Sequence, residues 1–101
     1  MFGLKEIDIA KIQSIFNAFP EIEKAILHGS RAKGTFKPAS DIDLTLIGGQ
    51  LNFSVLNQIE IQLDDLLLPY TFDISILKQI SNPDLVEHIQ RVGLEFYVKN
   101  K

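Results

Sequence analysis

Apolar residues recur at helical spacing in three segments of the chain. The first segment lies near residues 5–18 and ends at Pro20, the second can be capped by Ser54 and ends at Pro69, and the third starts at residues 81–84 and stops at Gly93. The sequence SNPD at the last start offers a capping hydroxyl or amide, an early proline and an acidic first turn. Spacings of three and four residues predict one inward-facing stripe on each helix. The predicted stripe residues are Ile9, Ile12, Phe16 and Phe19, then Leu56, Ile59, Leu63 and Leu66, and finally Leu85, Ile89 and Val92.

Alternating polar and apolar residues predict strands between these helices. The predicted strands are residues 24–28, 41–47, 70–76 and 94–98, the last a short edge strand. Helices that alternate with strands indicate an α/β fold, in which a small mixed β-sheet packs against helices. The length of 101 residues fits a single domain over residues 1–101.

The composition limits the classes of function. The formal net charge of −3 argues against a surface that follows nucleic acid along its length, because such surfaces usually carry a basic stripe. No apolar run reaches membrane-spanning length, and the N-terminus has no signal-peptide pattern. The absence of cysteine fits a reducing compartment, so a cytoplasmic protein is expected. A hydrophobic content of 46% leaves room for an apolar surface that a partner covers.

The segment with the clearest chemistry is residues 29–44, which read GSRAKGTFKPASDIDL. Gly29 and Ser30 open a predicted turn or two of helix at residues 30–34, where backbone N–H groups and a hydroxyl can bind phosphate. Asp41 and Asp43 stand two apart on a predicted strand and therefore project from the same face. Paired carboxylates of this kind suit Mg²⁺, which proteins usually bind together with substrate phosphates.

Asp73 lies on the polar side of another predicted strand. If the two strands are neighbours in the sheet, Asp41, Asp43 and Asp73 converge beside the Gly29–Ser30 turn. Three carboxylates repel one another unless cations neutralise them, and two Mg²⁺ ions about 3.5–4 Å apart would do so. The alternative is that all three are solvated loop or strand residues. We favour the metal site because aspartate is disfavoured in strands.

These residues closely resemble the nucleotidyltransferase motif of the DNA polymerase β superfamily, and the short chain resembles a minimal nucleotidyltransferase with a polymerase β palm-like fold. The motif residues are Gly29, Ser30, Arg31, Gly34 and residues 40–44, with Asp73 in the position of the third carboxylate. The resemblance implies that Gly29 and Ser30 hold the terminal phosphates of the nucleotide. It also implies that Asp41 and Asp43 bind the metal ions, and that Asp73 is both a ligand and the general base.

Three further residues near the motif have two interpretations each, and a fourth residue, a second histidine, has one. Arg31 and Lys33 would neutralise the triphosphate or the pyrophosphate leaving group, or they belong to a solvated turn. His28 would contact the nucleotide, although packing beside the turn explains it more simply. His88 is predicted to lie on the surface.

The expected reaction is transfer of AMP from ATP to a hydroxyl group, with two Mg²⁺ ions and release of pyrophosphate. Minimal nucleotidyltransferases resemble the antitoxin half of bacterial toxin–antitoxin modules, whose partner is a HEPN-type ribonuclease that the antitoxin adenylylates on tyrosine. The resemblance therefore implies an antitoxin that modifies a HEPN-type toxin. Two alternatives stay open: an antitoxin that acts only by complex formation, and a transferase for small aminoglycoside-like acceptors. A homodimer and a hetero-oligomer are both compatible with the sequence.

Overall fold

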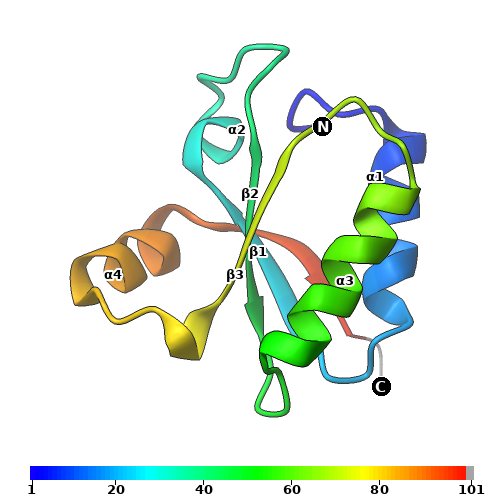
Figure 1. Ribbon diagram of the computed structural model, residues 1–101. Helices are drawn as coiled ribbons and strands as arrows, with labels where there is room; N and C mark the ends of the chain where they lie inside the picture. The colour runs from blue at the N-terminus through cyan, green and yellow to red at the C-terminus, as the bar shows by residue number, and fades with distance from the viewer. Residues whose placement is uncertain (100–101) are drawn as a thin grey trace.

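The protein is a small mixed sheet with helices on both faces, as the alternation of helices and strands predicts. The computed structural model describes residues 1–99, and Figure 1 shows their arrangement. In chain order the elements are α1 (Glu6–Asn17), β1 (Lys24–His28), α2 (Gly29–Lys33), β2 (Ile42–Ile47), α3 (Phe53–Asp65), β3 (Phe72–Ile76), the 3₁₀ turn η1 (Leu77–Gln79), α4 (Pro83–Val92) and β4 (Leu94–Val98). The predicted α/β fold is confirmed, and the strand bounds differ from the predicted ones by at most two residues.

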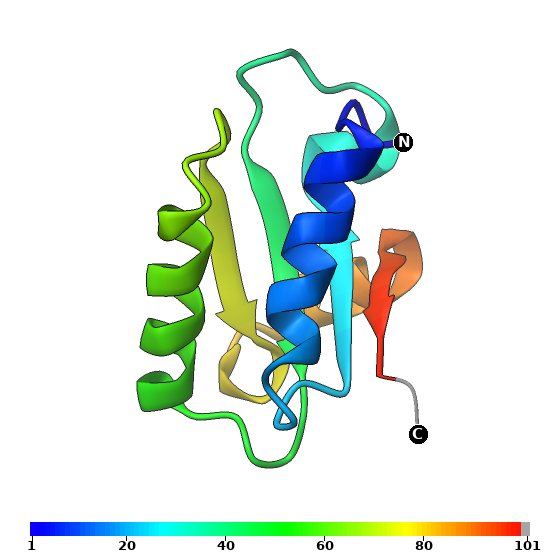
Figure 2. The same ribbon diagram turned by 90° about the vertical axis from the view of Figure 1, so that its right-hand side faces the viewer.

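The sheet combines antiparallel and parallel pairs. Its order is β3-β2-β1-β4, in which β1 pairs antiparallel with both β2 and β4, whereas β2 and β3 run parallel. Parallel strands need a long crossover, and α3 provides it between β2 and β3. Helices α1 and α3 lie side by side on one face of the sheet, and α4 lies on the opposite face (Figures 1 and 2). The site motif at residues 29–43 follows β1 and leads into β2 at one end of the sheet.

The main core fills the space between the sheet and the two helices α1 and α3. Alternation sends one side of each strand toward these helices, so Leu27 and Leu44 are completely buried. Ile12 and Phe16 from α1 and Ile59 from α3 are equally inaccessible to solvent. Burying such a side chain stabilises the folded state by about 1.5–3 kcal/mol each. This face therefore fixes the strands whose opposite sides carry the motif residues.

Helix α4 covers only part of the opposite face. Ile89 is buried at 2% exposure, but Leu85, predicted to face inward, is 41% exposed, so that part of the stripe prediction is wrong. The helix approaches the sheet closely only near its C-terminal end, where a methyl group on Gly93 would overlap Cγ2 of Ile26. Leu85 lies about two helical turns before Gly93 and stays exposed. Much of this sheet face is left to polar side chains.

Asparagine side chains cap the N-termini of the two later helices. Asn52 Oδ1 accepts a hydrogen bond from the Val55 N–H at 2.9 Å, so α3 begins earlier than the predicted start at Ser54. Asn82 Oδ1 caps α4 by accepting from the Asp84 N–H at 3.0 Å, which selects the amide among the two groups predicted. The helices are short, α3 having 13 residues. None within residues 1–99 combines the length and apolar content that crossing a membrane requires.

Candidate active site

Asp43 and Asp73 face each other across the parallel pair of strands. In the register of β2 and β3, Asp43 is the direct partner of Asp73, and the flanking pairs place Ile42 beside Phe72 and Thr45 beside Ser75. Both acids project from the polar side of the sheet, because the apolar residues next to them along β2 and β3 point toward the core. The parallel pairing therefore brings together two carboxylates that are far apart in the sequence.

Asp41 lies immediately before β2, at the end of the motif loop. Burial raises the pKa of the half-buried Asp43 carboxyl, and the nearby Asp73 and Asp41 carboxylates raise it further. The His28 ring acts against these effects and lowers the pKa of Asp43. The predicted acids are thus close enough to interact electrostatically, with Asp43 at their centre.

The Gly29–Ser30 turn touches this group of acids. Gly29 has a φ of +74°, and a Cβ atom there would overlap Oδ2 of Asp43, so only glycine fits beside the carboxylate. The turn continues as the single helical turn α2, in which the Ser30 carbonyl accepts hydrogen bonds from the Gly34 and Thr35 N–H groups. The predicted phosphate-binding turn is therefore in direct contact with one of the predicted metal ligands, Asp43.

A chain of polar side chains extends from the turn across the sheet. His28 is the antiparallel partner of Asp43, and its Nε2 lies 3.0 Å from Oγ1 of Thr45, which in turn lies 2.8 Å from Oγ of Ser75. Thr45 is fully buried, so these bonds satisfy a hydroxyl that water does not reach. The sequence analysis did not predict this chain. The alternation of polar and apolar residues in β2 and β3 could have predicted it, since Thr45 and Ser75 each follow a site aspartate by two positions and therefore share its face.

Burial favours a neutral His28 ring, against the effect of the neighbouring carboxylates. Partial burial lowers the pKa of His28, and His88 lowers it further, while Asp43 and Asp73 raise it. His88 on α4 is half-buried, so it lies at the surface only in part, and it is near enough to His28 to affect the pKa of that ring. Helix α4 reaches over the sheet at this point and brings the second histidine toward the first.

Arg31 occupies a different place from the one its predicted role requires. Its side chain is 2% exposed, and its guanidinium donates to the backbone carbonyls of Ser40 and Phe2. A side chain whose donors already bind the protein interior has few left for a triphosphate. We therefore do not include Arg31 among the phosphate-binding groups. Lys33 is exposed at the end of α2, and its predicted role stays a prediction.

The carboxylates suit a divalent cation but do not form a complete metal site alone. Within residues 1–99, the two ion pairs are Lys24–Glu95 and Arg91–Glu87, and neither neutralises a site aspartate. Asp43 thus keeps a raised pKa in a crowded acidic environment, which a cation would relieve. In the same part of the chain, no three His, Cys, Asp or Glu side chains are arranged to hold a metal ion by themselves. Remaining ligands would have to come from substrate phosphates and water, which is the usual mode of Mg²⁺ binding.

The family of the chain follows from its sequence. The family described as Polymerase beta, Nucleotidyltransferase matches residues 10–101. The chain belongs to this family. A search of curated protein sequences gives no match. The matched residues of this nucleotidyltransferase domain include the stretch from β1 to β2 that brings Gly29 beside Asp43.

Solved structures with the nucleotidyltransferase fold are similar over nearly all of the chain. A toxin–antitoxin crystal structure with AMP-PNP has a TM-score of 0.71 at 22% identity, over 96% of this chain and 76% of the other. The toxin–antitoxin MntA-HepT gives 0.68 at 16% identity, over 94% and 74%. A protein from Sulfolobus solfataricus assigned to the nucleotidyltransferases gives 0.62 at 19% identity, over 99% and 86%. These similarities confirm the predicted nucleotidyltransferase fold.

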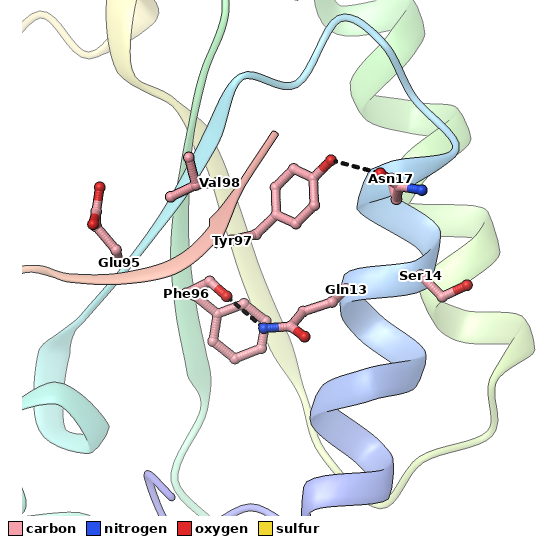
Figure 3. Close-up of a pocket in the computed structure, with 7 residues that line it drawn as sticks. All are labelled: Gln13, Ser14, Asn17, Glu95, Phe96, Tyr97 and Val98. Carbon is pink, nitrogen blue, oxygen red and sulfur yellow. Dashed lines mark hydrogen bonds between the residues drawn. The ribbon is translucent and has the colours of Figure 1, made fainter. Parts of the chain in front are cut away.

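A separate hollow lies away from the acids, between α1 and β4 (Figure 3). It has a volume of about 670 Å³ and is crossed by two hydrogen bonds. Gln13 Nε2 donates to the Phe96 carbonyl at 2.8 Å, and the Tyr97 hydroxyl donates to Asn17 Oδ1 at 3.3 Å. These bonds fix the edge strand to α1. The hollow contains no pair of acids and no phosphate-binding turn, so the candidate site of the nucleotidyltransferase is the Asp43–Asp73 edge.

Proposed function

We propose that this nucleotidyltransferase transfers AMP from ATP to a hydroxyl group of a partner protein, in a reaction that depends on Mg²⁺. The observation that carries the proposal is the register pair Asp43–Asp73 in contact with the Gly29 turn. Family membership supplies the reaction class, and the acids supply the ligands that such a reaction needs.

Each residue of the site has a specific task in this proposal. The Gly29–Ser30 turn binds the terminal phosphates through its backbone N–H groups and the Ser30 hydroxyl. Asp41, Asp43 and Asp73 would hold two Mg²⁺ ions, which would neutralise the charge on the triphosphate. Asp73 accepts the proton of the attacking hydroxyl. The hydroxyl oxygen bonds to the α-phosphorus, the α–β bridging bond breaks, and pyrophosphate leaves.

We further propose that the acceptor is a tyrosine of a HEPN-type toxin and that the protein acts as its antitoxin. Support comes from the similarity in fold to the toxin–antitoxin MntA-HepT and to a toxin–antitoxin crystallised with AMP-PNP. The exposed apolar side chains of Phe53, Ile61 and Leu67 fit a protein that functions in a complex.

The proposal is tested by incubating the protein and a HEPN-type partner with Mg²⁺ and ATP labelled at the α-phosphate. We expect label on a partner tyrosine, no label from γ-labelled ATP, and a loss of about 100-fold or more for Asp43→Asn and Asp73→Asn. The matched control Asp64→Asn, on the exposed side of α3, keeps the activity. Bound ATP and Mg²⁺ without any label on the partner would refute the protein-modifying role. Neutralisation by an Asp41→Asn, Asp43→Asn double variant would show instead that complex formation is sufficient, and labelled aminoglycoside without a partner would show a small-molecule transferase.

A further inference from the structure

Arg31 is held by backbone carbonyls on three sides. Its Nε and Nη2 both donate to the carbonyl oxygen of Ser40, at 3.2 and 2.9 Å. Nη1 donates to the Phe2 carbonyl at 3.0 Å, and Nη2 also reaches the Pro38 carbonyl at 3.4 Å. The planar guanidinium makes all of these bonds at once, which an ammonium group cannot do from one position.

Two aromatic rings lie against the guanidinium of Arg31. The Cζ atom of Arg31 lies 5.3 Å from the centre of the Phe36 ring and 5.5 Å from that of Tyr70. Both distances are within the range of cation–π attraction. Tyr70 is itself anchored to α1, because its hydroxyl donates to Oδ2 of the buried Asp8 at 3.0 Å. The guanidinium is therefore fixed relative to the body of the protein as well as to the loop.

The carbonyl that receives two of these hydrogen bonds belongs to the peptide group joining Ser40 to Asp41. Asp41 lies outside β2, whereas Asp43 and Asp73 are held inside the strand ladder. On its other side, the next residue Ile42 donates its N–H to the Thr71 carbonyl at 2.8 Å. Among the three acids, Asp41 is thus the one whose backbone position depends on a side chain.

We infer that Arg31 is a positioning residue for Asp41. The fork of N–H donors on its guanidinium holds the Ser40–Asp41 peptide and so directs the Asp41 carboxylate toward Asp43 and the proposed metal ions. In this role the guanidinium does not contact phosphate. The inference rests on the proposed function, because Asp41 acts there as a metal ligand.

Arg31→Lys tests this role, because it keeps the positive charge and most of the length but removes the fork. The matched control is Arg91→Lys on α4, where the arginine is exposed and pairs only with Glu87 at 3.7 Å. Amide hydrogen exchange is measured without ligand. We expect faster exchange at Ile42 in Arg31→Lys, since its N–H bond to the Thr71 carbonyl follows directly on the held peptide, and unchanged exchange at Leu44 in the middle of β2.

The second measurement is the Mg²⁺ concentration at which AMP-PNP binds half-maximally. We expect Arg31→Lys to raise it about 10-fold, the size of effect typical for groups that orient a metal ligand. In an Asp41→Asn background the same substitution has no further effect, whereas in an Asp73→Asn background it keeps its full effect. This double-mutant cycle separates a specific action on Asp41 from general destabilisation, which would act equally in both backgrounds.

Each outcome decides a different question. An equal effect of Arg31→Lys in both backgrounds overturns the positioning role, as does loss of AMP-PNP binding at saturating Mg²⁺, which indicates direct phosphate contact. If the wild-type protein does not bind AMP-PNP with Mg²⁺, the proposed function fails, and the exchange data still decide whether Arg31 fixes Asp41. If Arg31→Lys does not fold, Phe36→Leu keeps the guanidinium but removes one ring, and unchanged exchange at Ile42 then contradicts the inference.

Discussion

Asp43 and Asp73 are direct register partners in β2 and β3, with the Asp43 carboxylate in contact range of the Gly29 turn. Two carboxylates side by side on a sheet, without an ion-pair partner among residues 1–99, reduce the stability of the metal-free protein. The arrangement that would bind a cation is therefore also a local weakness of the fold.

Replacing Asp43 by asparagine is expected to stabilise the protein in the absence of metal. The pKa of Asp43 is raised above its ordinary value of 3.8 in the folded state, mainly by burial. Its contribution to stability is therefore complete below pH 3.8 and is lost as the pH rises through the folded-state pKa. The measurement is urea unfolding in EDTA from pH 4 to 7. At pH 7 the free energy of unfolding should be higher for Asp43→Asn than for the wild type, and it should be unchanged for Asp64→Asn. A less stable Asp43→Asn at pH 7 contradicts the prediction.

His28 is expected to make the protein less stable in mild acid. Because the pKa of His28 is lowered in the folded state, mainly by burial, its contribution is present above the unfolded-state value of 6.5 and is lost as the pH falls through the folded-state pKa. The free energy of unfolding should thus decrease below pH 6.5, and this decrease should become shallower in His28→Gln. His88→Gln is the control and should keep most of the decrease in the free energy of unfolding below pH 6.5. Parallel curves for wild type and His28→Gln between pH 5 and 7 would show that His28 has no such effect.

Gly29 and Gly34 allow the contact with Asp43 to be separated from backbone strain. Both have positive φ, +74° and +79°, but only a methyl group on Gly29 meets the Asp43 carboxylate, while the space around Gly34 is open. Gly34→Ala should cost about 1–2 kcal/mol from the left-handed backbone alone. Gly29→Ala should cost more in urea unfolding and should also weaken Mg²⁺-dependent AMP-PNP binding. Equal losses of stability and unaffected nucleotide binding would mean that Gly29 does not position Asp43.

Leu67 occupies a backbone position that favours glycine. It follows the C-terminal end of α3 with a φ of +55° and an exposure of 88%. Leu67→Gly should raise the free energy of unfolding by about 0.5 kcal/mol, since relief of strain exceeds the added entropy of the unfolded chain. Leu67→Ala keeps the strain and removes the exposed side chain, so it should not stabilise the protein. Urea unfolding of both variants provides the measurement, and a gain in Leu67→Ala equal to that in Leu67→Gly would contradict the explanation.

The sequence predicts the scaffold well because alternation and helical spacing are local signals. The polar faces of β2 and β3 follow from counting residues by twos, and the motif spacing places Gly29 near Asp43. The pairing of β2 with β3 is a property of the whole sheet, so the sequence analysis could state it only as a condition, which the register of Asp43 and Asp73 fulfils.

The environment of individual polar side chains could not be predicted in the same way. In the sequence, an arginine beside a phosphate-binding motif looks the same whether its side chain faces the ligand or the interior of the protein. Arg31 faces the interior because Phe2, far away in the sequence, supplies one of its carbonyl acceptors. Leu85 fits the helical stripe but is exposed, because α4 buries its apolar side toward its C-terminal end, at Ile89 and next to Gly93. Such contacts depend on where separate elements meet, which spacing along one element does not encode.

The parallel pairing of β2 and β3 makes the chemistry conditional on completed folding. Between the two aspartates the chain must leave the sheet, run back along it as α3 and re-enter, so the acids meet only after this crossover has docked. A nascent chain that has already formed β1, α2 and β2 contains the whole phosphate-binding turn and still lacks the third acid. In the proposed reaction, an incompletely folded chain could not consume nucleotide, because the third acid is in place only after the edge strand β3 has paired with β2.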